Sequence, residues 1–201
     1  MLAFGDYLPR PLRRLTIADP DDIDTTLTAA RRVVVVGADA DLASVLTRLL
    51  RAELLNVEVA YVPRRRTPAT RAYRLPSGRR AARRARRGTA QRVPLIRDDT
   101  GSVIVGSALW QPTGDKPLLH GEAVVDDAVL FDGDVAKVRV EPTAALPGLR
   151  ARVSGERRWL AGRAAQLGCL GVTVVRDGVA VPRPVRRSTI YRHTQGWLAV
   201  R

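Results

Sequence analysis

The hydrophobic pattern of the first third of the chain predicts a parallel β-α-β unit. Val33–Val36 are four consecutive valines between arginine and Gly37, which indicates a strand buried on both faces. From Asp41 to Arg51 the apolar positions recur with the helical period, and Val57–Val62 alternate as a second strand. The unit fills residues 33–62, and its parallel strands imply a right-handed crossover.

Two further helices are predicted on either side of this unit. The acidic run at residues 19–24 is typical of a turn that enters a short helix, with aspartate as its cap. Residues 77–87 form a basic helix that Ser77 caps and Gly88 ends. Alanines at positions 81, 82 and 85 give this helix only a thin apolar stripe.

The pattern changes near Val93 to short apolar strands separated by turns. Turn sequences rich in aspartate and glycine occur at residues 98–101, 132–133 and 177–178. Strands this short and this regularly spaced are typical of an antiparallel sheet or sandwich. We therefore expect a small α/β domain over residues 1–92, followed by an all-β, antiparallel, sandwich-like domain over residues 93–201.

Positive charge is concentrated in about one fifth of the chain. The 201 residues are 45% hydrophobic, enough for a core, and their net charge is +14. Residues 59–97 hold 13 arginines and no acidic residue, so this stretch carries nearly all of the excess. The arginine-rich segment, residues 63–92, therefore favours an anionic ligand or a polyanion as partner.

Cysteine content and hydropathy indicate a protein of a reducing compartment. Cys169 is the only cysteine, so no intramolecular disulfide can form, and its apolar neighbours predict a small buried side chain. The first residues lack the apolar core of a signal peptide, and no apolar run approaches the roughly 18 residues of a membrane span. We expect a cytoplasmic protein, with peripheral attachment to an anionic membrane as an alternative.

Two loops at the carboxyl ends of the predicted parallel strands are candidate ligand sites. Gly37, Asp39 and Asp41 follow the first strand, at the edge where open α/β sheets bind ligands. The second loop supplies Arg64, Arg65, Arg66, Thr67 and Arg71. Guanidinium groups match phosphate geometry, which predicts a phosphate-bearing ligand. The alternatives are an ordinary turn capped by aspartate, and a solvated basic loop that pairs with the nearby acids.

The basic helix is a third candidate site. Its charged positions are Arg79, Arg80, Arg83, Arg84, Arg86 and Arg87. Such a face suits a nucleic-acid backbone or an anionic membrane surface. The sequence contains no helix-turn-helix, finger or aromatic stacking motif, so sequence-specific recognition is not indicated. A solvated helix is the alternative.

Other residue types point to structural roles. His120 and His193 lie far apart and outside metal-ligand spacing, so no metal site is predicted. Trp159, Tyr191 and Trp197 are expected to anchor the β-rich core or a contact in a homo-oligomer.

The order of an α/β part followed by a β-rich part, together with the sequence from Val33 to Asp41, resembles the NAD kinase and diacylglycerol kinase superfamily. In that family a hydrophobic strand runs into a Gly-Gly-Asp-Gly-Thr loop and then a helix. The glycines let backbone N–H groups approach nucleotide phosphates, and the aspartate acts at the phosphoryl-transfer centre with magnesium. Gly37 and Asp39 fall on the first glycine and the aspartate, whereas alanines replace the next two glycines and Asp41 replaces the threonine.

Two further family landmarks are present in altered form. The family has a proline and a Gly-Thr-Gly-Asn loop after the next strand, and here Pro63 is followed by residues 64–71 without glycine. The family's Asp-Gly-Glu hairpin corresponds to Asp177-Gly178-Val179, which lacks the glutamate. Only about 30 residues precede Val33, so the family's opening strand and helices are expected to be missing.

The resemblance implies a diverged, truncated and catalytically impaired relative that binds a phosphate-bearing nucleotide or lipid. If phosphoryl transfer survives, the resemblance implies an ATP-dependent lipid or NAD kinase, with Asp39 as catalytic residue and ATP and Mg²⁺ as cofactors. The alternative is a non-enzymatic nucleic-acid-binding or scaffold protein that uses the basic segment 64–92.

Overall fold

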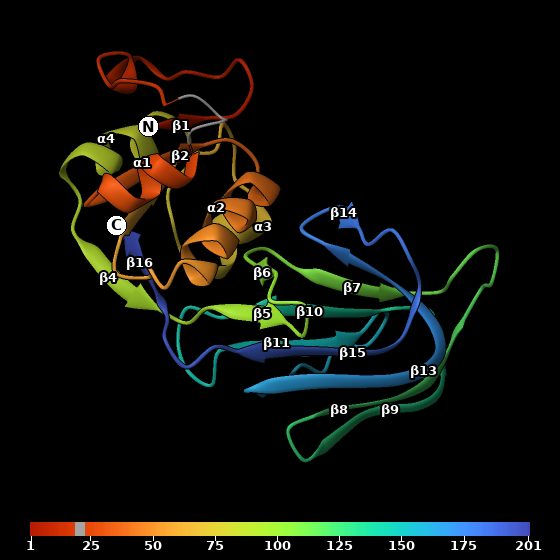
Figure 1. Cartoon of the computed structure of the whole chain (residues 1–201). Helices are drawn as coiled ribbons and strands as arrows, with labels where there is room; N and C mark the ends of the chain where they lie inside the picture. The colour runs from red at the N-terminus through yellow and green to blue at the C-terminus, as the bar shows by residue number, and fades with distance from the viewer. Residues whose placement is uncertain (19–22) are drawn as a thin grey trace.

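The computed structural model describes residues 1–18 and 23–201, in an α/β half and a β-rich half that lie side by side (Figure 1). Both chain ends lie in the α/β half. The predicted fold class is confirmed, with parallel strands in the first half and a larger antiparallel sheet in the second. The helix expected after the acidic run is α1 (Ile23–Ala29), while its predicted cap at residues 19–22 lies outside the described residues.

The first sheet contains the predicted β-α-β unit, made by β2 (Arg32–Val36), α2 (Asp39–Arg51) and β3 (Glu58–Tyr61). Its strand order is β1-β2-β3-β16-β4, and its other members are β1 (Leu2–Ala3), β16 (Trp197–Val200) and β4 (Ala90–Val93). β1, β2, β3 and β16 run parallel, and β4 runs antiparallel to β16.

Helices cover both faces of this sheet, as the continuous valines of β2 predict. Val33 and Val35 pack with the apolar side of α2 and with α3 (Pro68–Ala72). Val34 and Val36 face the other way, toward α4 (Gly78–Arg87) and the single turn η1 (Arg10–Leu12). The alternating side chains of one strand thereby fill two separate apolar cores.

The basic helix α4 packs on the sheet through small residues, and Arg32 donates hydrogen bonds to the carbonyls of Ala85 and Gly88 at its end. Ala81, Ala82 and Ala85 are buried against the sheet, which confirms the thin apolar stripe. Ser77 is the N-cap residue, and the N–H of Gly88 closes the last turn on the carbonyl of Arg84 at 2.7 Å. Because the stripe is narrow, every arginine of α4 remains exposed.

The β-rich half is an antiparallel sheet of eleven strands around a second core that includes Trp110. Its long strand β13 pairs with β15 and β8 in its first half and with β7 and β14 in its second. The strands are β5 (Ile96–Asp98), β6 (Val103–Ile104), β7 (Ala108–Gln111), β8 (Leu119–Val125), β9 (Ala128–Val135), β10 (Val138–Pro142), β11 (Leu149–Val153), β12 (Leu160–Gly162), β13 (Ala164–Arg176), β14 (Val179–Ala180) and β15 (Val185–Arg192).

Two expectations about local structure are wrong. The turn predicted at residues 132–133 lies inside β9, where Gly133 pairs with Gly121 of β8, and the chain reverses instead at Asp126 and Asp127. Gly133 adopts a positive φ of 109° within the strand, a conformation that glycine allows, so the preference of the dipeptide for positive φ is met without a chain reversal. An opening strand is also present, because β1 extends the sheet beside β2.

The last strand crosses back from the β-rich half to the α/β half. β16 lies between β3 and β4, and Trp197 is buried in the core of the first sheet beside Tyr73. The domain boundary predicted near residue 93 does not account for this crossing. The sequence of a short apolar strand does not indicate which of two sheets the strand joins.

No helix among the described residues is both long and apolar enough to cross a membrane. Cys169 is partly rather than fully buried, and burial raises the pKa of its thiol.

Candidate functional site

The loop between β2 and α2 is closed around its own carboxylate. Gly37 and Ala38 turn the chain, and α2 begins at Asp39. The Asp41 carboxylate accepts a hydrogen bond of 2.7 Å from the N–H of Ala38 and lies against Gly37, where any Cβ atom would collide with it. A side-chain carboxylate therefore occupies the helix N-terminus, the position at which free N–H groups could receive a phosphate.

Asp39 is tied to the neighbouring strand and loop. Only 8% of its surface is exposed. Its Oδ1 accepts a hydrogen bond of 2.8 Å from the hydroxyl of Tyr61 at the end of β3, and its Oδ2 accepts one of 3.0 Å from the N–H of Ala69 in α3. Burial, followed by the charge of Asp39, raises the pKa of Tyr61, so the phenol remains a donor. The carboxylate thus fastens the first candidate loop to the second.

Asp177 holds a third segment in place. It sits in the turn between β13 and β14, with a positive φ of 49° followed by Gly178, which confirms the predicted hairpin. Its carboxylate accepts hydrogen bonds from the backbone N–H groups of Val105 at 3.0 Å, Gly106 at 2.7 Å and Ser107 at 3.0 Å. The turn is therefore hydrogen-bonded to the backbone segment that links β6 to β7.

The three segments that carry the family resemblance meet at Gly106. A Cβ atom on this glycine would lie 2.7 Å from Oδ2 of Asp39, 2.9 Å from Cβ of Pro68 and 3.0 Å from Oδ1 of Asp177. Only a residue without a side chain fits between these groups. Gly106 and Tyr61 are not identified from the sequence, because a single glycine near a short strand and a tyrosine at a strand end are both ordinary features.

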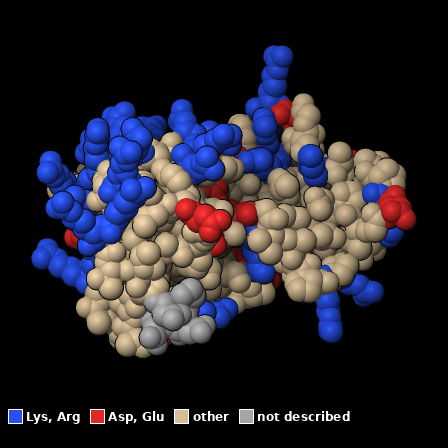
Figure 2. Space-filling model, turned by 90° about the horizontal axis from the view of Figure 1, so that it is seen from above, with Lys and Arg blue, Asp and Glu red and all other residues tan. Residues whose placement is uncertain are grey.

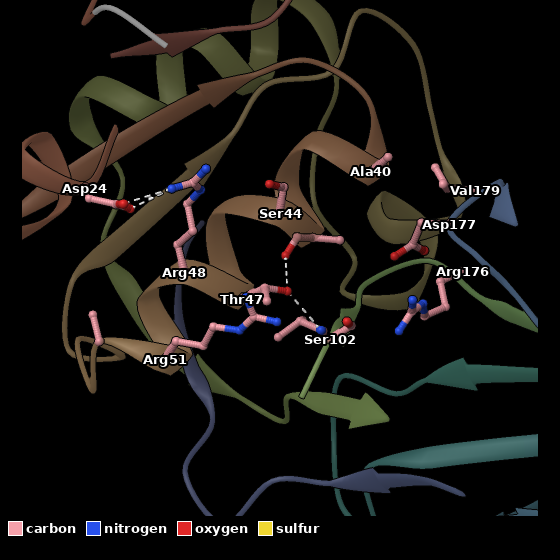
Figure 3. A pocket seen from close by; sticks show the side chains of 13 residues that line it. Asp24, Ala40, Ser44, Thr47, Arg48, Arg51, Ser102, Arg176, Asp177 and Val179 are labelled. Atoms are coloured by element: carbon pink, nitrogen blue, oxygen red, sulfur yellow. Dashed lines mark hydrogen bonds and ion pairs between the residues drawn. The ribbon is translucent and has the colours of Figure 1, made fainter. Parts of the chain in front are cut away.

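A cleft of about 670 Å³ opens beside this junction, between α2 and the β13–β14 turn (Figure 3). Arg48 on one wall is engaged by Asp24, with N–O distances of 2.8 and 2.9 Å. Arg176 on the opposite wall bonds Asp98 and the Thr100 hydroxyl. Most charged groups that line the cleft are therefore already paired within the protein.

The buried position of Asp177 raises the pKa of its carboxyl from 3.8 to about 6, although its three backbone donors oppose the shift. The raised folded-state pKa implies stability that is fully present below the unfolded pKa and is lost as the pH rises through about 6. We expect this loss to reach about 3 kcal/mol, and Asp177→Asn to remove it from the pH dependence of urea unfolding.

Asp126→Asn is the control for this prediction. Asp126 also sits in a hairpin turn at positive φ and accepts N–H bonds from Arg163 and Ala164, but it is exposed. An Asp177→Asn profile that parallels the wild-type profile from about pH 4 to 7 would mean that Asp177 titrates normally.

The second candidate loop divides into a capped turn and an arginine group. Thr67 caps α3, since its hydroxyl accepts from the N–H of Thr70 at 3.2 Å and the Thr70 hydroxyl accepts from the N–H of Thr67 at 2.8 Å. Arg64 and Arg65 are exposed. Arg66 and Arg71 instead line a separate cavity, so the structure groups them with residues of α4 and with Arg201 and not with the 37–41 loop.

This second cavity, which we call the arginine cavity, has a volume of about 550 Å³. Six arginines from four segments line it together with Leu75, Pro76 and Ser77: Arg66, Arg71, Arg74, Arg80, Arg84 and Arg201. Arg79, Arg83, Arg86 and Arg87 of α4 are exposed without lining it. Seen from above, basic side chains crowd the α/β half, and a small acidic group lies in the hollow between the halves (Figure 2).

Two of the aromatic residues for which structural roles are predicted, Trp159 and Tyr191, contact arginine side chains of the protein. Arg150 and Arg152 stack on Trp159, and Arg97 stacks on Tyr191. Across residues 1–18 and 23–201, no group of three or more His, Cys, Asp or Glu side chains is arranged to hold a metal ion.

Neither a model of a known protein family nor a curated protein matches the sequence. Solved structures do match. A diacylglycerol kinase from Bacillus anthracis str. Sterne aligns over 91% of this chain and 81% of its own, with a TM-score of 0.69 and 12% identity. The NAD kinase from Archaeoglobus fulgidus in complex with ATP aligns over 95% and 86%, with a TM-score of 0.65 and 11% identity.

The chain has the diacylglycerol kinase and NAD kinase fold. Yeast NADH kinase complexed with NADH has it too, with a TM-score of 0.60, 11% identity and coverage of 89% of this chain and 63% of the yeast chain. The predicted resemblance is thereby confirmed at the level of the fold. Within this fold, the loops that carry the resemblance are bonded to one another, and the carboxylates of Asp39, Asp41 and Asp177 are all hydrogen-bonded within the protein.

Proposed function

We propose that this chain is a kinase-fold protein that binds a phosphate-bearing ligand through its arginine-rich segment and does not transfer phosphate. The observation that carries this proposal is that the carboxylates of Asp39 and Asp41, in the 37–41 loop, accept hydrogen bonds from groups of the protein itself. Phosphoryl transfer depends mainly on positioned phosphates and on charge stabilisation by metal ions and donors. Asp41 occupies the N–H of Ala38 and adds negative charge at the helix N-terminus, where it would repel a phosphate, and both Asp39 oxygens are already hydrogen-bonded within the protein.

The ligand-binding part of the proposal is supported by arginine side chains that form no ion pair among the described residues. Of the arginines in segment 63–92, Arg66 and Arg71 come from the loop that corresponds to a family landmark, and both face the arginine cavity. Arginine binds phosphate oxygens bidentately and keeps its charge at any physiological pH. The titles of similar structures name ATP and NADH as bound ligands, so nucleotides are the first compounds to test.

The test combines a transfer assay with a binding assay. We expect no phosphate transfer from Mg²⁺-ATP to diacylglycerol vesicles or to NAD. We expect ATP, ADP or NAD to raise the midpoint of thermal unfolding, because a ligand of the native state stabilises it by mass action. The double substitution Arg66→Gln with Arg71→Gln should abolish the rise. Arg64→Gln with Arg65→Gln makes the same charge change in the same loop outside the cavity, and it should preserve the rise.

Transfer at rates of about 1–100 per second, typical of kinases, that Asp39→Asn abolishes would overturn the proposal. So would the failure of every phosphate compound to shift the midpoint, or an equal loss in both double variants.

A non-enzymatic role in nucleic-acid binding is the second candidate. It is favoured by four exposed arginines of α4 that lie outside the cavity. Figure 2 shows that basic side chains crowd the surface of the α/β half. It predicts binding to duplex DNA or RNA that weakens steeply with salt. Vesicles of anionic lipid are the parallel assay for peripheral attachment of a cytoplasmic protein to a membrane.

A further inference from the structure

The arginine cavity concentrates positive charge that no acidic residue balances. None of its lining residues is acidic. Among the described residues, none of its six guanidinium groups takes part in an ion pair. The adjoining cavity shares Arg71, Arg74 and Arg201, and its one acid, Glu141, is already paired with Arg139 and Arg150 at 2.6 and 2.7 Å. Because like charges held close together repel one another, an anion bound from solution would stabilise this cavity.

Two lining residues, Arg201 and Ser77, have polar groups that lack an expected hydrogen bond within the protein. Arg201 donates to the carbonyl of Tyr73 at 3.1 Å and to Gln91 at 3.3 Å, which fixes its position, yet its buried Nε has no partner. Ser77 is the N-cap residue of α4, but its hydroxyl accepts no capping bond. Both residues line the cavity, so one buried donor without a partner, Nε of Arg201, accompanies the unpaired guanidinium groups.

We propose that the arginine cavity binds a compact ligand with several linked phosphate groups, and that it binds the metal-free form. This inference rests on the proposed function and names the ligand class. One phosphate group presents about three acceptor oxygens, too few for six guanidinium forks, whereas a triphosphate group presents enough for most of them. The cavity offers no aspartate or glutamate side chain for Mg²⁺, so the arginines themselves neutralise the phosphates.

The shape of the site favours a small ligand over a nucleic acid. Its volume of about 550 Å³ lies within the range of roughly 300–1,000 Å³ that is usual for small-molecule pockets. A duplex backbone instead needs an extended surface. Four arginines of α4 lie outside the cavity, so they would contribute to a nucleic-acid complex as much as the two that line it.

The helix α4 provides matched variants for the test. Arg80→Gln with Arg84→Gln removes two charges from the cavity. Arg79→Gln with Arg83→Gln removes two charges at the same spacing from the same helix outside it. Binding of inorganic tripolyphosphate to the full chain is measured by titration calorimetry without Mg²⁺. We expect the first pair to weaken binding on the order of 100-fold and the second pair less than about 3-fold.

Two further titrations sharpen the result. Excess Mg²⁺ is expected to weaken tripolyphosphate binding, because it neutralises the phosphate oxygens, whereas a kinase site requires it. ATP without Mg²⁺ distinguishes the source of the phosphates: similar affinities assign a free polyphosphate, and clearly tighter ATP binding assigns a nucleotide.

Three results would overturn the inference: equal weakening by both pairs, binding that needs Mg²⁺, or a short DNA duplex that binds more tightly than tripolyphosphate. In each case an ATP-induced rise in unfolding midpoint that depends on Arg66 and Arg71 would leave the proposed function standing. Circular dichroism spectra that match the wild type exclude misfolding of the variants.

Discussion

Replacing Asp39 with alanine is expected to lower the free energy of unfolding by about 4 kcal/mol, because each buried donor left without a partner costs about 1–3 kcal/mol and the removed carboxylate leaves a void. The donors are the Tyr61 hydroxyl and the Ala69 N–H, and their loss detaches β3 and α3 from the start of α2. Urea unfolding measures the change.

The sign of this effect separates a structural from a catalytic role. Residues kept for catalysis often reduce stability, so their removal is neutral or stabilising. Ser44→Ala is the control, since Ser44 is exposed on the same helix and should change stability by less than about 0.5 kcal/mol. If Asp39→Ala were as stable as this control, the carboxylate would be available to a ligand and the proposed loss of transfer would lose its main support.

Truncation of Trp197 to alanine is expected to have a comparable effect, about 4 kcal/mol, as for other buried tryptophans. Only 1% of the Trp197 surface is exposed, and its ring meets that of Tyr73 edge-on at 5.2 Å between centroids. The tryptophan anchors β16 in the first sheet, and the Tyr73 carbonyl positions Arg201 in the arginine cavity. We therefore expect the substitution to weaken tripolyphosphate binding as well.

Trp159→Ala is the matched control for the tryptophan substitution. Trp159 is partly exposed and packs under Arg150 and Arg152, an arrangement worth about 1 kcal/mol or less per contact. Unfolding is followed by far-ultraviolet circular dichroism, since both variants lose tryptophan fluorescence. Equal destabilisation by the two substitutions would mean that β16 is not anchored through Trp197.

The sequence predicts those features of the fold that depend only on residues close to one another in the chain. The four valines of β2, the alanine stripe of α4 and the Asp177-Gly178 turn each express a local period or a backbone preference, and all three are confirmed. The Asp132-Gly133 prediction is wrong because both residues are paired across the β8–β9 hairpin, and Gly133 takes its positive φ of 109° within the strand.

The roles of the site residues depend on partners that are distant in sequence. Asp39 receives its hydrogen bonds from residues 22 and 30 positions away, and Asp177 binds backbone about 70 positions away. No periodicity encodes such pairings. The sequence therefore identifies the loops that matter, while only the fold shows that Asp39 faces inward and that Arg66 and Arg71 face α4.

The position of β16 has a consequence for how the protein forms. β16 lies between β3 and β4, yet it is made after every strand of the β-rich half. During synthesis β3 and β4 therefore lack the strand that pairs between them until β16 has been made. About a hundred residues of the second sheet are made in the meantime, at about 5–20 residues per second. The α/β half is encoded first but completed only by β16, and its arginine cavity is complete only once Arg201, the residue after β16, has been made.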